Sequence, residues 1–299
     1  MLNRWVLGVF GFRFPIFLTS CHLLQGFCIL SPFMALPANA RLHRATLEKQ
    51  GRGIAAVGVF KVANIALNNM SLVFLSLSLS QIIRSGIPVM TALVGVAIEK
   101  KVPTPFELLS LVILTAGVVL SVWEGSVSGS TVGIGLSLAS VLCGAAMLSF
   151  SGRALSEELD VFRLTFYTAP VSVAVLLPVL LWQEVGPLTE YWSAQGTWAL
   201  VAYLLSGGMI AMLYNIVHYR MIQITSATLT PVIGMIKVVG IVVLSAAFLG
   251  ERDIFTVRMV IGCTLAVMGR RSQRRGRPPA ANQRAAKQLM GGSGFCLAP

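Results

Sequence analysis

The sequence predicts an all-α polytopic membrane protein, built as an inverted repeat of five plus five helices, and three observations lead to this fold class. Of the 299 residues, 56% are hydrophobic and 11% are charged, whereas soluble domains have about 25% charged residues. Apolar stretches of about 20 residues recur with short breaks, and a helix of that length crosses a bilayer. A charged turn followed by a helix occurs twice with the same internal spacing.

The apolar stretches predict about nine spans, separated by short polar breaks. We expect them near residues 15–38, 53–72, 77–98, 104–123, 131–150, 162–182, 197–222, 227–249 and 254–269. We expect that residues 1–14 do not form a signal peptide, because Arg4 and Arg13 bracket a short apolar run with no small-residue cleavage site after it. We expect that a first helix is largely missing from this chain.

The repeat is seen most clearly in two Glu-to-Gly segments. Glu99 and Gly117 are eighteen residues apart, as are Glu251 and Gly269, and each segment starts a helix after a charged turn. Five crossings separate the two turns, so they lie on opposite sides of the membrane. Such inverted repeats are typical of secondary transporters. We expect one transmembrane domain over residues 1–269, with halves at about 1–125 and 130–269.

The charges also indicate how the chain is oriented. The breaks on one side of the membrane hold most of the basic residues, and those on the opposite side hold several acidic residues. The positive-inside rule assigns the basic side to the cytosol. Residues 270–299 have no apolar periodicity and predict a disordered basic cytosolic tail. The basic side contains Arg41, Arg44, Lys49, Arg52, Lys100, Lys101, Arg153, Arg163 and Arg220.

Some functional classes are excluded by the sequence. The net charge is +12, and the basic residues lie in the breaks between spans and in the tail rather than along a water-facing surface with interleaved aromatic residues. We therefore expect membrane lipid, and no nucleic acid, as a partner. The cysteines show no metal-ligand spacing, so we expect no metal and no cofactor. Nucleophile, zinc-hydrolase and phosphate-loop motifs are absent from the sequence, which favours a transporter over an enzyme.

Two cations inside predicted spans are the main candidates for substrate binding. Arg84 and Lys237 occupy positions within one residue of each other when the two repeats are aligned. A cation near the bilayer centre costs about 2.5–3.5 kcal/mol on insertion scales, and no Asp or Glu lies mid-span to pair with either. The substrate is therefore expected to bring the counterion, and a phosphate suits both side chains.

Four further polar residues complete the predicted substrate site. Lys61 is a third cation, which could instead extend outward to the membrane surface. Asn68 belongs to a set of amides at helical spacing, and Tyr214 with Asn215 could offer a hydroxyl and an amide to a phosphate or sugar. Tyr219, near the end of the same span, has the ordinary interpretation of an interfacial anchor.

Several segments are similar to those of a known transporter family, and together they cover nearly the whole chain. These segments are NRW at 3–5, FRFP at 12–15, FLT at 17–19, NMSL at 69–72, SQIIRS at 80–85, YTAP at 167–170, YN at 214–215, TSA at 225–227 and GMIK at 234–237. The chain resembles the triose-phosphate translocator and nucleotide-sugar transporter family of the drug/metabolite transporter superfamily. The resemblance implies that fold, with ten helices and both ends cytosolic.

The resemblance also implies roles for individual residues. Arg84, Tyr214 and Lys237 match the phosphate-holding residues of the family's plastid exchangers. Val238 stands where those exchangers have an arginine, and Asn68 where they have a threonine. This Lys-Val pattern is similar to the plant and protist branch associated with the Golgi and nucleotide sugars.

The leading hypothesis is therefore a Golgi antiporter that exchanges a nucleotide sugar for a nucleoside monophosphate by alternating access. One alternative is an exchanger of sugar phosphates or phosphoenolpyruvate for phosphate in the plastid inner envelope. A non-transporting membrane scaffold or a truncated inactive remnant is an alternative of another class. The sequence leaves a homodimer open.

Overall fold

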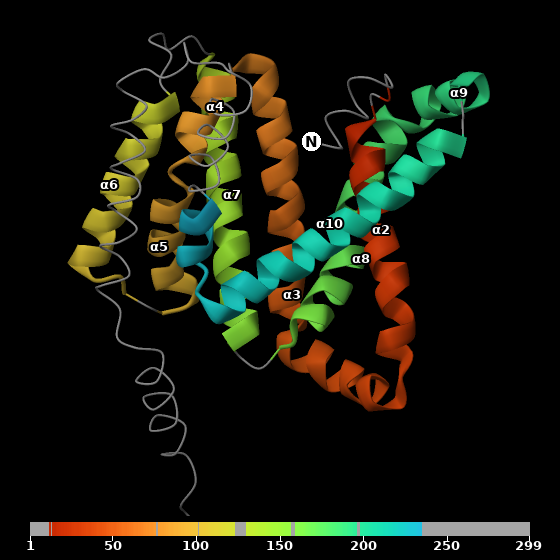
Figure 1. Cartoon of the computed structure of the whole chain (residues 1–299), viewed down its shortest axis with the longest axis horizontal. Helices are drawn as coiled ribbons and strands as arrows, with labels where there is room; N and C mark the ends of the chain where they lie inside the picture. The colour runs from red at the N-terminus through yellow and green to blue at the C-terminus, as the bar shows by residue number, and fades with distance from the viewer. Residues whose placement is uncertain are drawn as a thin grey trace, which may run out of the picture. The chain divides into compact units, whose positions relative to one another are not determined.

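The computed structural model describes residues 12, 14–75, 77–100, 102–122, 130–156, 159–195 and 198–234. The chain divides into two compact units. The first comprises residues 1–102 and 123–234, and the second comprises residues 103–122 and 235–299. Every element of the described part is an α-helix (Figure 1). The helices are α2 (Pro15–Ala35), α3 (Pro37–Phe74), α4 (Leu77–Arg84), α5 (Ile87–Ile98), α6 (Pro105–Val122), α7 (Thr131–Ser156), α8 (Val161–Gln183), α9 (Val185–Gln195) and α10 (Trp198–Ile224). Among these helices, α6 alone belongs to the second unit.

Five of the described helices are long and apolar enough to cross a membrane. They are α2, α7, α8, most of α3 and most of α10, and a shorter apolar stretch covers Ile82–Ile98. Large apolar side chains are exposed on these helices, with Trp182 87% and Trp198 89% exposed at helix ends, as expected of surfaces that face lipid and its interface. The all-α polytopic fold class is confirmed. The repeat turn at 251–253, the span at 254–269 and the tail at 270–299 lie outside the described residues.

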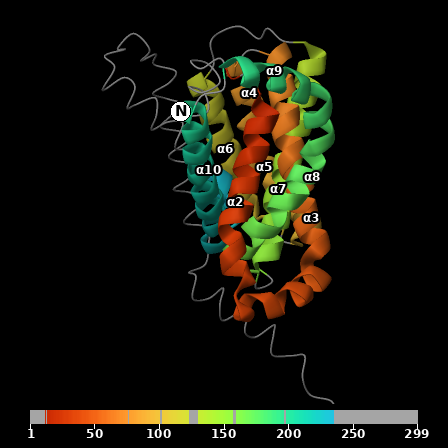
Figure 2. The ribbon, with the colours of Figure 1, turned by 90° about the vertical axis from the view of Figure 1, so that its right-hand side faces the viewer.

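The predicted break between the first two spans is wrong for residues 39–52. The chain turns at the single residue Leu36, which is extended because it precedes Pro37, and α3 begins at once with that proline at its start. Residues 39–52 are helical and contain good helix formers, including the pair Arg44–Glu48 at 2.8 Å. In Figures 1 and 2 these first turns of α3 run in a different direction from the rest of the helix.

The predicted span at 77–98 is two helices rather than one. Helix α4 ends at Arg84, two residues form a turn, and α5 begins at Ile87. Pro88 explains the break, because it has no N–H to donate to the carbonyl of Arg84. Ser85 Oγ donates to the carbonyl of Ile82 at 2.6 Å and so stabilises the end of α4. Arg84 is therefore the last helical residue before an interruption.

One helix was not predicted from the sequence. Helix α9 is too short to cross a bilayer, and its residues Leu188 and Tyr191 pack on the buried pair Phe12 and Phe14. Trp192 of the same helix is exposed. An amphipathic helix of this kind is suited to lie at a membrane interface.

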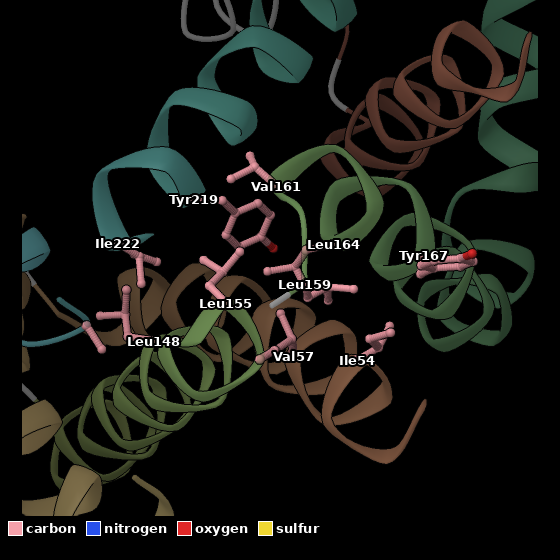
Figure 3. Close-up of a cluster of buried hydrophobic side chains, with 12 residues drawn as sticks. Ile54, Val57, Leu148, Leu155, Leu159, Val161, Leu164, Tyr167, Tyr219 and Ile222 are labelled. Atoms are coloured by element: carbon pink, nitrogen blue, oxygen red, sulfur yellow. The ribbon is translucent and has the colours of Figure 1, made fainter. Parts of the chain in front are cut away.

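The largest core cluster of the first unit joins α3, α7, α8 and α10 (Figure 3). Val57, Leu155 and Leu164 meet Tyr219, which is 1% exposed. The interpretation of Tyr219 as an interfacial anchor is therefore wrong. Its ring fills the space where four helices converge, and it fixes the end of α10 against the helices that carry the polar residues described below.

Helices α3 and α7 pack most extensively and run side by side (Figures 1 and 2). Their contact uses small residues on α7 at helical spacing, as is usual for close helix packing in lipid. A Cβ atom on Gly133 would lie 2.6 Å from Phe74 Cβ, and one on Gly144 would lie 3.3 Å from Asn64 Cγ. The buried small residues at this spacing include Gly133, Ser137, Ser140 and Gly144.

Candidate functional site

A polar stripe runs along α3 within its apolar part. It consists of Lys61, Asn64 and Asn68, which are spaced so that they share one face of the helix. With a rise of 1.5 Å per residue, the backbone positions of Lys61 and Asn68 are about 10 Å apart along the helix axis. The stripe therefore presents a cation at one end and an amide at the other.

Arg84 extends this stripe at the Asn68 end. Its Nη1 donates to Asn68 Oδ1 at 2.7 Å and lies 3.5 Å from Ser140 Oγ, so the guanidinium of α4 is held against both α3 and α7. Its place at the C-terminal end of α4 is favourable for a cation, because unpaired carbonyls carry partial negative charge there. Arg84 is partly buried.

Ser140 connects the same three helices. It is fully buried, and its hydroxyl lies 2.9 Å from Asn64 Oδ1 and 3.0 Å from the Asn64 carbonyl. Gly144, one turn further along α7, leaves room for the Asn64 side chain. The position of the Arg84 guanidinium is thus fixed by a connected set of polar contacts.

Lys61 does not extend outward to the membrane surface. Its Nζ donates to Asn215 Oδ1 of α10 at 3.0 Å and lies 5.9 Å from the centre of the Tyr219 ring, which is a cation–π distance. Asn215 Nδ2 donates to the Ala211 carbonyl at 2.9 Å, and this bond turns the amide oxygen toward Lys61. The outward interpretation of Lys61 is wrong for this structure.

The charges of these two cations are not balanced within the described part of the chain. Neither Arg84 nor Lys61 has a carboxylate partner among the residues that the structure describes. Their contacts are amide and hydroxyl oxygens and an aromatic ring, all of which are neutral. Lys237 lies outside the described residues.

Tyr214 is not brought to these cations by any described contact. Its side chain is 60% exposed, and its ring stacks on His218 one turn further along α10, with centroids 5.9 Å apart. Asn215, the next residue, points instead to Lys61. The structure thus joins Lys61 with Asn215 and Arg84 with Asn68, and it leaves Tyr214 on another face of α10.

One residue of the polar network, Ser140, was missed from the sequence. Asn64, which belongs to the predicted set of amides at helical spacing, was not among the predicted site residues, and it joins Ser140 in supporting Arg84. Ser140 belongs to a series of small residues at spacings of four, three and four on α7. That pattern indicates a tightly packed helix face and could have identified the position, although not its contact with Arg84.

Residues 1–271 match the Triose-phosphate Transporter family. The chain belongs to this family. It is 29% identical to a probable sugar phosphate/phosphate translocator of Arabidopsis thaliana, with 90% of this chain and 87% of the relative covered. It is also 28% identical to UDP-uronic acid transporter 1 of the same plant, again with 90% and 87% covered.

A solved crystal structure shares the fold of this family member. The two superpose with a TM-score of 0.59 at 13% sequence identity, over 91% of this chain and 92% of the other. The family assignment and the apolar helices establish an integral membrane protein of a transporter family.

Proposed function

We propose that this protein is a secondary antiporter that exchanges a nucleotide sugar for a nucleoside monophosphate by alternating access. The observation that carries the proposal is the pair of intramembrane cations, Arg84 and Lys61, whose described partners are all neutral. A buried cation is costly unless an anion compensates it. A phosphate-bearing substrate would supply that anion.

Arg84 is the proposed phosphate-binding residue. Its guanidinium presents several N–H donors in a plane, which matches two phosphate oxygens at once. Asn68 and Ser140 hold one edge of the group, so the fork would meet the substrate in a preset orientation. Lys237, at the corresponding position of the second repeat in the sequence, is proposed as a second phosphate-binding residue.

The same cations favour exchange over one-way transport. A transporter that changed conformation without a bound substrate would carry these uncompensated charges through a closed state of low dielectric constant. An anion bound in each direction lowers the free-energy cost of that step. Both a nucleotide sugar and a nucleoside monophosphate provide such an anion.

The proposed location is the Golgi membrane. The resemblance of Lys237-Val238 to the Golgi branch supports this location. The relative named UDP-uronic acid transporter 1 supports a nucleotide sugar as the substrate. Sugar phosphate/phosphate exchange is the second candidate, because the relative of 29% identity is named a probable sugar phosphate/phosphate translocator. The proposed location in that case is the plastid inner envelope. The two candidates differ in the counter-substrate that drives uptake.

Liposomes preloaded with UMP, GMP or inorganic phosphate separate these candidates. Uptake of a labelled nucleotide sugar driven by its monophosphate would support the Golgi antiporter, and phosphate-driven uptake of triose phosphate would move the protein to the second candidate. No exchange with any load would reject both and favour a non-transporting membrane scaffold.

Two variants test the assigned residues. Arg84→Gln and Lys237→Ala are each expected to lower exchange at least about tenfold, since each removes a charge-assisted contact with phosphate. Arg44→Gln is the matched control, because Arg44 is exposed and pairs with Glu48 at the helix surface. That control should exchange like the wild type.

A further inference from the structure

Helix α3 is longer than one bilayer crossing requires. Its 38 residues follow a path of about 57 Å, whereas the hydrocarbon core of a bilayer is about 30 Å thick. Residues 53–74 form the apolar part of the helix and suffice for one crossing. Residues 37–52 therefore extend beyond the hydrocarbon, and they run crosswise between the end of α2 and the rest of α3 (Figures 1 and 2). A helix in this place lies at the level of the lipid headgroups.

One side of this segment is held by the protein. His43 contacts the Tyr167 hydroxyl of α8 and the carbonyl of Met34 near the end of α2, and Gln50 is buried. His43 and Gln50 are seven residues apart, or about two helical turns, so they mark the same side of the helix. The segment is thus fixed on α2 and α8, and its opposite side is exposed.

The exposed side carries a basic face, which consists of Arg41, Lys49 and Arg52. Positions that are eight and eleven residues apart fall on the same side of an α-helix. All three side chains are exposed, and the acidic residue of this segment, Glu48, forms an ion pair with Arg44. Within the part of the chain that the structure describes, no ion pair neutralises the basic face.

Apolar side chains accompany the basic face. Leu42 is 44% exposed and lies about two helical turns from Lys49, and Ala45 lies between Arg41 and Lys49. Arginine and lysine place their methylene groups along apolar surface while their charged ends reach outward. Basic residues with an exposed apolar side chain beside them are typical of helices that bind the surface of an anionic bilayer.

We infer that the basic face of α3 is a docking site for anionic phospholipid headgroups of the membrane in which the protein is embedded. The phosphate and carboxylate of these headgroups would supply the anions that the face lacks. A bilayer is favoured over a soluble acidic protein because Arg52 directly precedes the apolar part of α3, so headgroups lie within a Debye length of about 8–10 Å. The inference does not depend on the transported substrate, and its test measures no transport.

Native mass spectrometry of the full chain in neutral detergent tests this inference. Phosphatidylserine and phosphatidylcholine are added in equal amounts, and the bound molecules of each lipid are counted. The wild type is expected to retain phosphatidylserine in preference, and the preference should fall as the salt concentration rises, because salt screens exposed charges. Equal binding of the two lipids by the wild type would overturn the inference.

A triple variant locates the preference on α3. Arg41→Gln, Lys49→Gln and Arg52→Gln together are expected to weaken phosphatidylserine binding at least about tenfold, because each basic residue near an anionic surface contributes roughly fivefold in affinity. Unchanged binding would overturn the inference.

The matched control removes the same charge elsewhere on the chain. It combines substitutions of three exposed basic residues outside the segment, namely Lys100→Gln, Arg153→Gln and Arg220→Gln. The control should keep the wild-type preference. An equal loss in both triple variants would assign the preference to net charge and reject the docking site.

Photocrosslinking keeps the inference testable if the triple variant does not fold. In a variant without the five native cysteines, Ala45→Cys would carry a photoactivatable maleimide in the middle of the basic face. In vesicles with equal amounts of both lipids, it is expected to crosslink to phosphatidylserine in preference to phosphatidylcholine. Ala40→Cys, exposed on another side of the same segment, is the control and should show less preference. The same preference at both positions would reject a defined docking site.

Discussion

Asn215 is oriented before any substrate arrives. One side of its amide is bound to the Ala211 carbonyl of its own helix, and the other accepts from Lys61 on a helix far away in sequence. Asn68 has a similar place at Arg84. In both pairs a neutral oxygen holds a cation in position while leaving its charge available to an anion.

Asn215→Asp is expected to impair transport through charge rather than shape. The carboxylate is nearly the same size as the amide and would lie about 3 Å from Lys61 Nζ, close enough for a strong charge-assisted hydrogen bond. The ammonium would then be neutralised from within the protein, and uptake of an anionic substrate should fall about tenfold or more. Exchange assays in liposomes measure this.

The control for that variant is Asn39→Asp, which introduces the same change beside Arg163, outside the polar stripe. Wild-type exchange by Asn215→Asp, in protein that folds normally, would contradict a substrate role for Lys61.

The charged residues of the site and two of their neutral partners, Asn68 and Asn215, were predictable from the sequence, and Ser140 was not. Arg84 and Lys61 stand out in the sequence because each interrupts an apolar stretch. Ser140 does not, since a serine in a lipid-spanning helix is as consistent with close packing as with a polar network. Only the three-dimensional contact between α4 and α7 distinguishes the two.

At the scale of elements, the start of α2 is held by a residue from the end of α8. Pro15 opens α2, so the first N–H groups of the helix belong to Ile16 and Phe17, and both donate to the Glu184 carboxylate at 3.0 and 2.7 Å. Glu184 is buried. An anion at a helix N-terminus satisfies orphan N–H groups and interacts favourably with the helix dipole.

Glu184→Gln is therefore expected to reduce stability by about 1–2 kcal/mol, because one charged acceptor for two N–H groups becomes a neutral one. A thermal unfolding measurement in detergent would detect the lower melting temperature. Glu190→Gln, which changes the same charge at an exposed position of α9, provides the comparison. Equal melting temperatures for wild type and Glu184→Gln would show that water satisfies these N–H groups as well.

The close packing at Gly144 leads to a second prediction, on the contact between α3 and α7. Substitution of Gly144 by leucine would push against Asn64, whereas a Cβ atom added to Gly135 of the same helix would have no other atom within 4 Å. We expect Gly144→Leu to separate α3 from α7 and to lose both stability and exchange. Gly135→Leu should retain both in the same thermal and liposome assays, and equal behaviour of the two variants would contradict the packing argument.

The locations of the described long spans were predictable from apolar length, but their interruptions were not. Residues 39–52 were expected to form a break because they are charged, yet Arg, Leu, Glu and Lys are also good helix formers once Pro37 has started the helix. Pro88 divides α4 from α5, although the apolar run continues across it. Helix α9 was missed because its length is below that of a span.

At the scale of the whole molecule, the first unit has a basic end and an opposite end bearing α9. Arg163 of α8 donates to Asn39 of α3 at 3.2 Å, and His43 contacts both the Tyr167 hydroxyl and the Met34 carbonyl. These contacts bring together the adjoining ends of α2, α3 and α8. The basic residues of this end are those that the positive-inside rule assigns to the cytosol.

Cysteine labelling tests this sidedness. In a variant without the five native cysteines, Arg41→Cys should react with a membrane-impermeant maleimide in sealed, cytosol-side-out vesicles. Glu190→Cys on α9 should react only after the vesicles are opened. The reverse pattern would mean the opposite orientation, and equal labelling of both positions in sealed vesicles would reject the two-sided arrangement.

The one-residue turn at Leu36 has a mechanical consequence. Helix α2 ends at Ala35 and α3 begins at Pro37, so the joint between them contains no slack. Because this joint has no spare residues, we expect the adjoining ends of α2 and α3 to move together. The two-residue turn after Arg84 interrupts the helix beside the guanidinium, so a change in the angle between α4 and α5 would move this cation relative to α3.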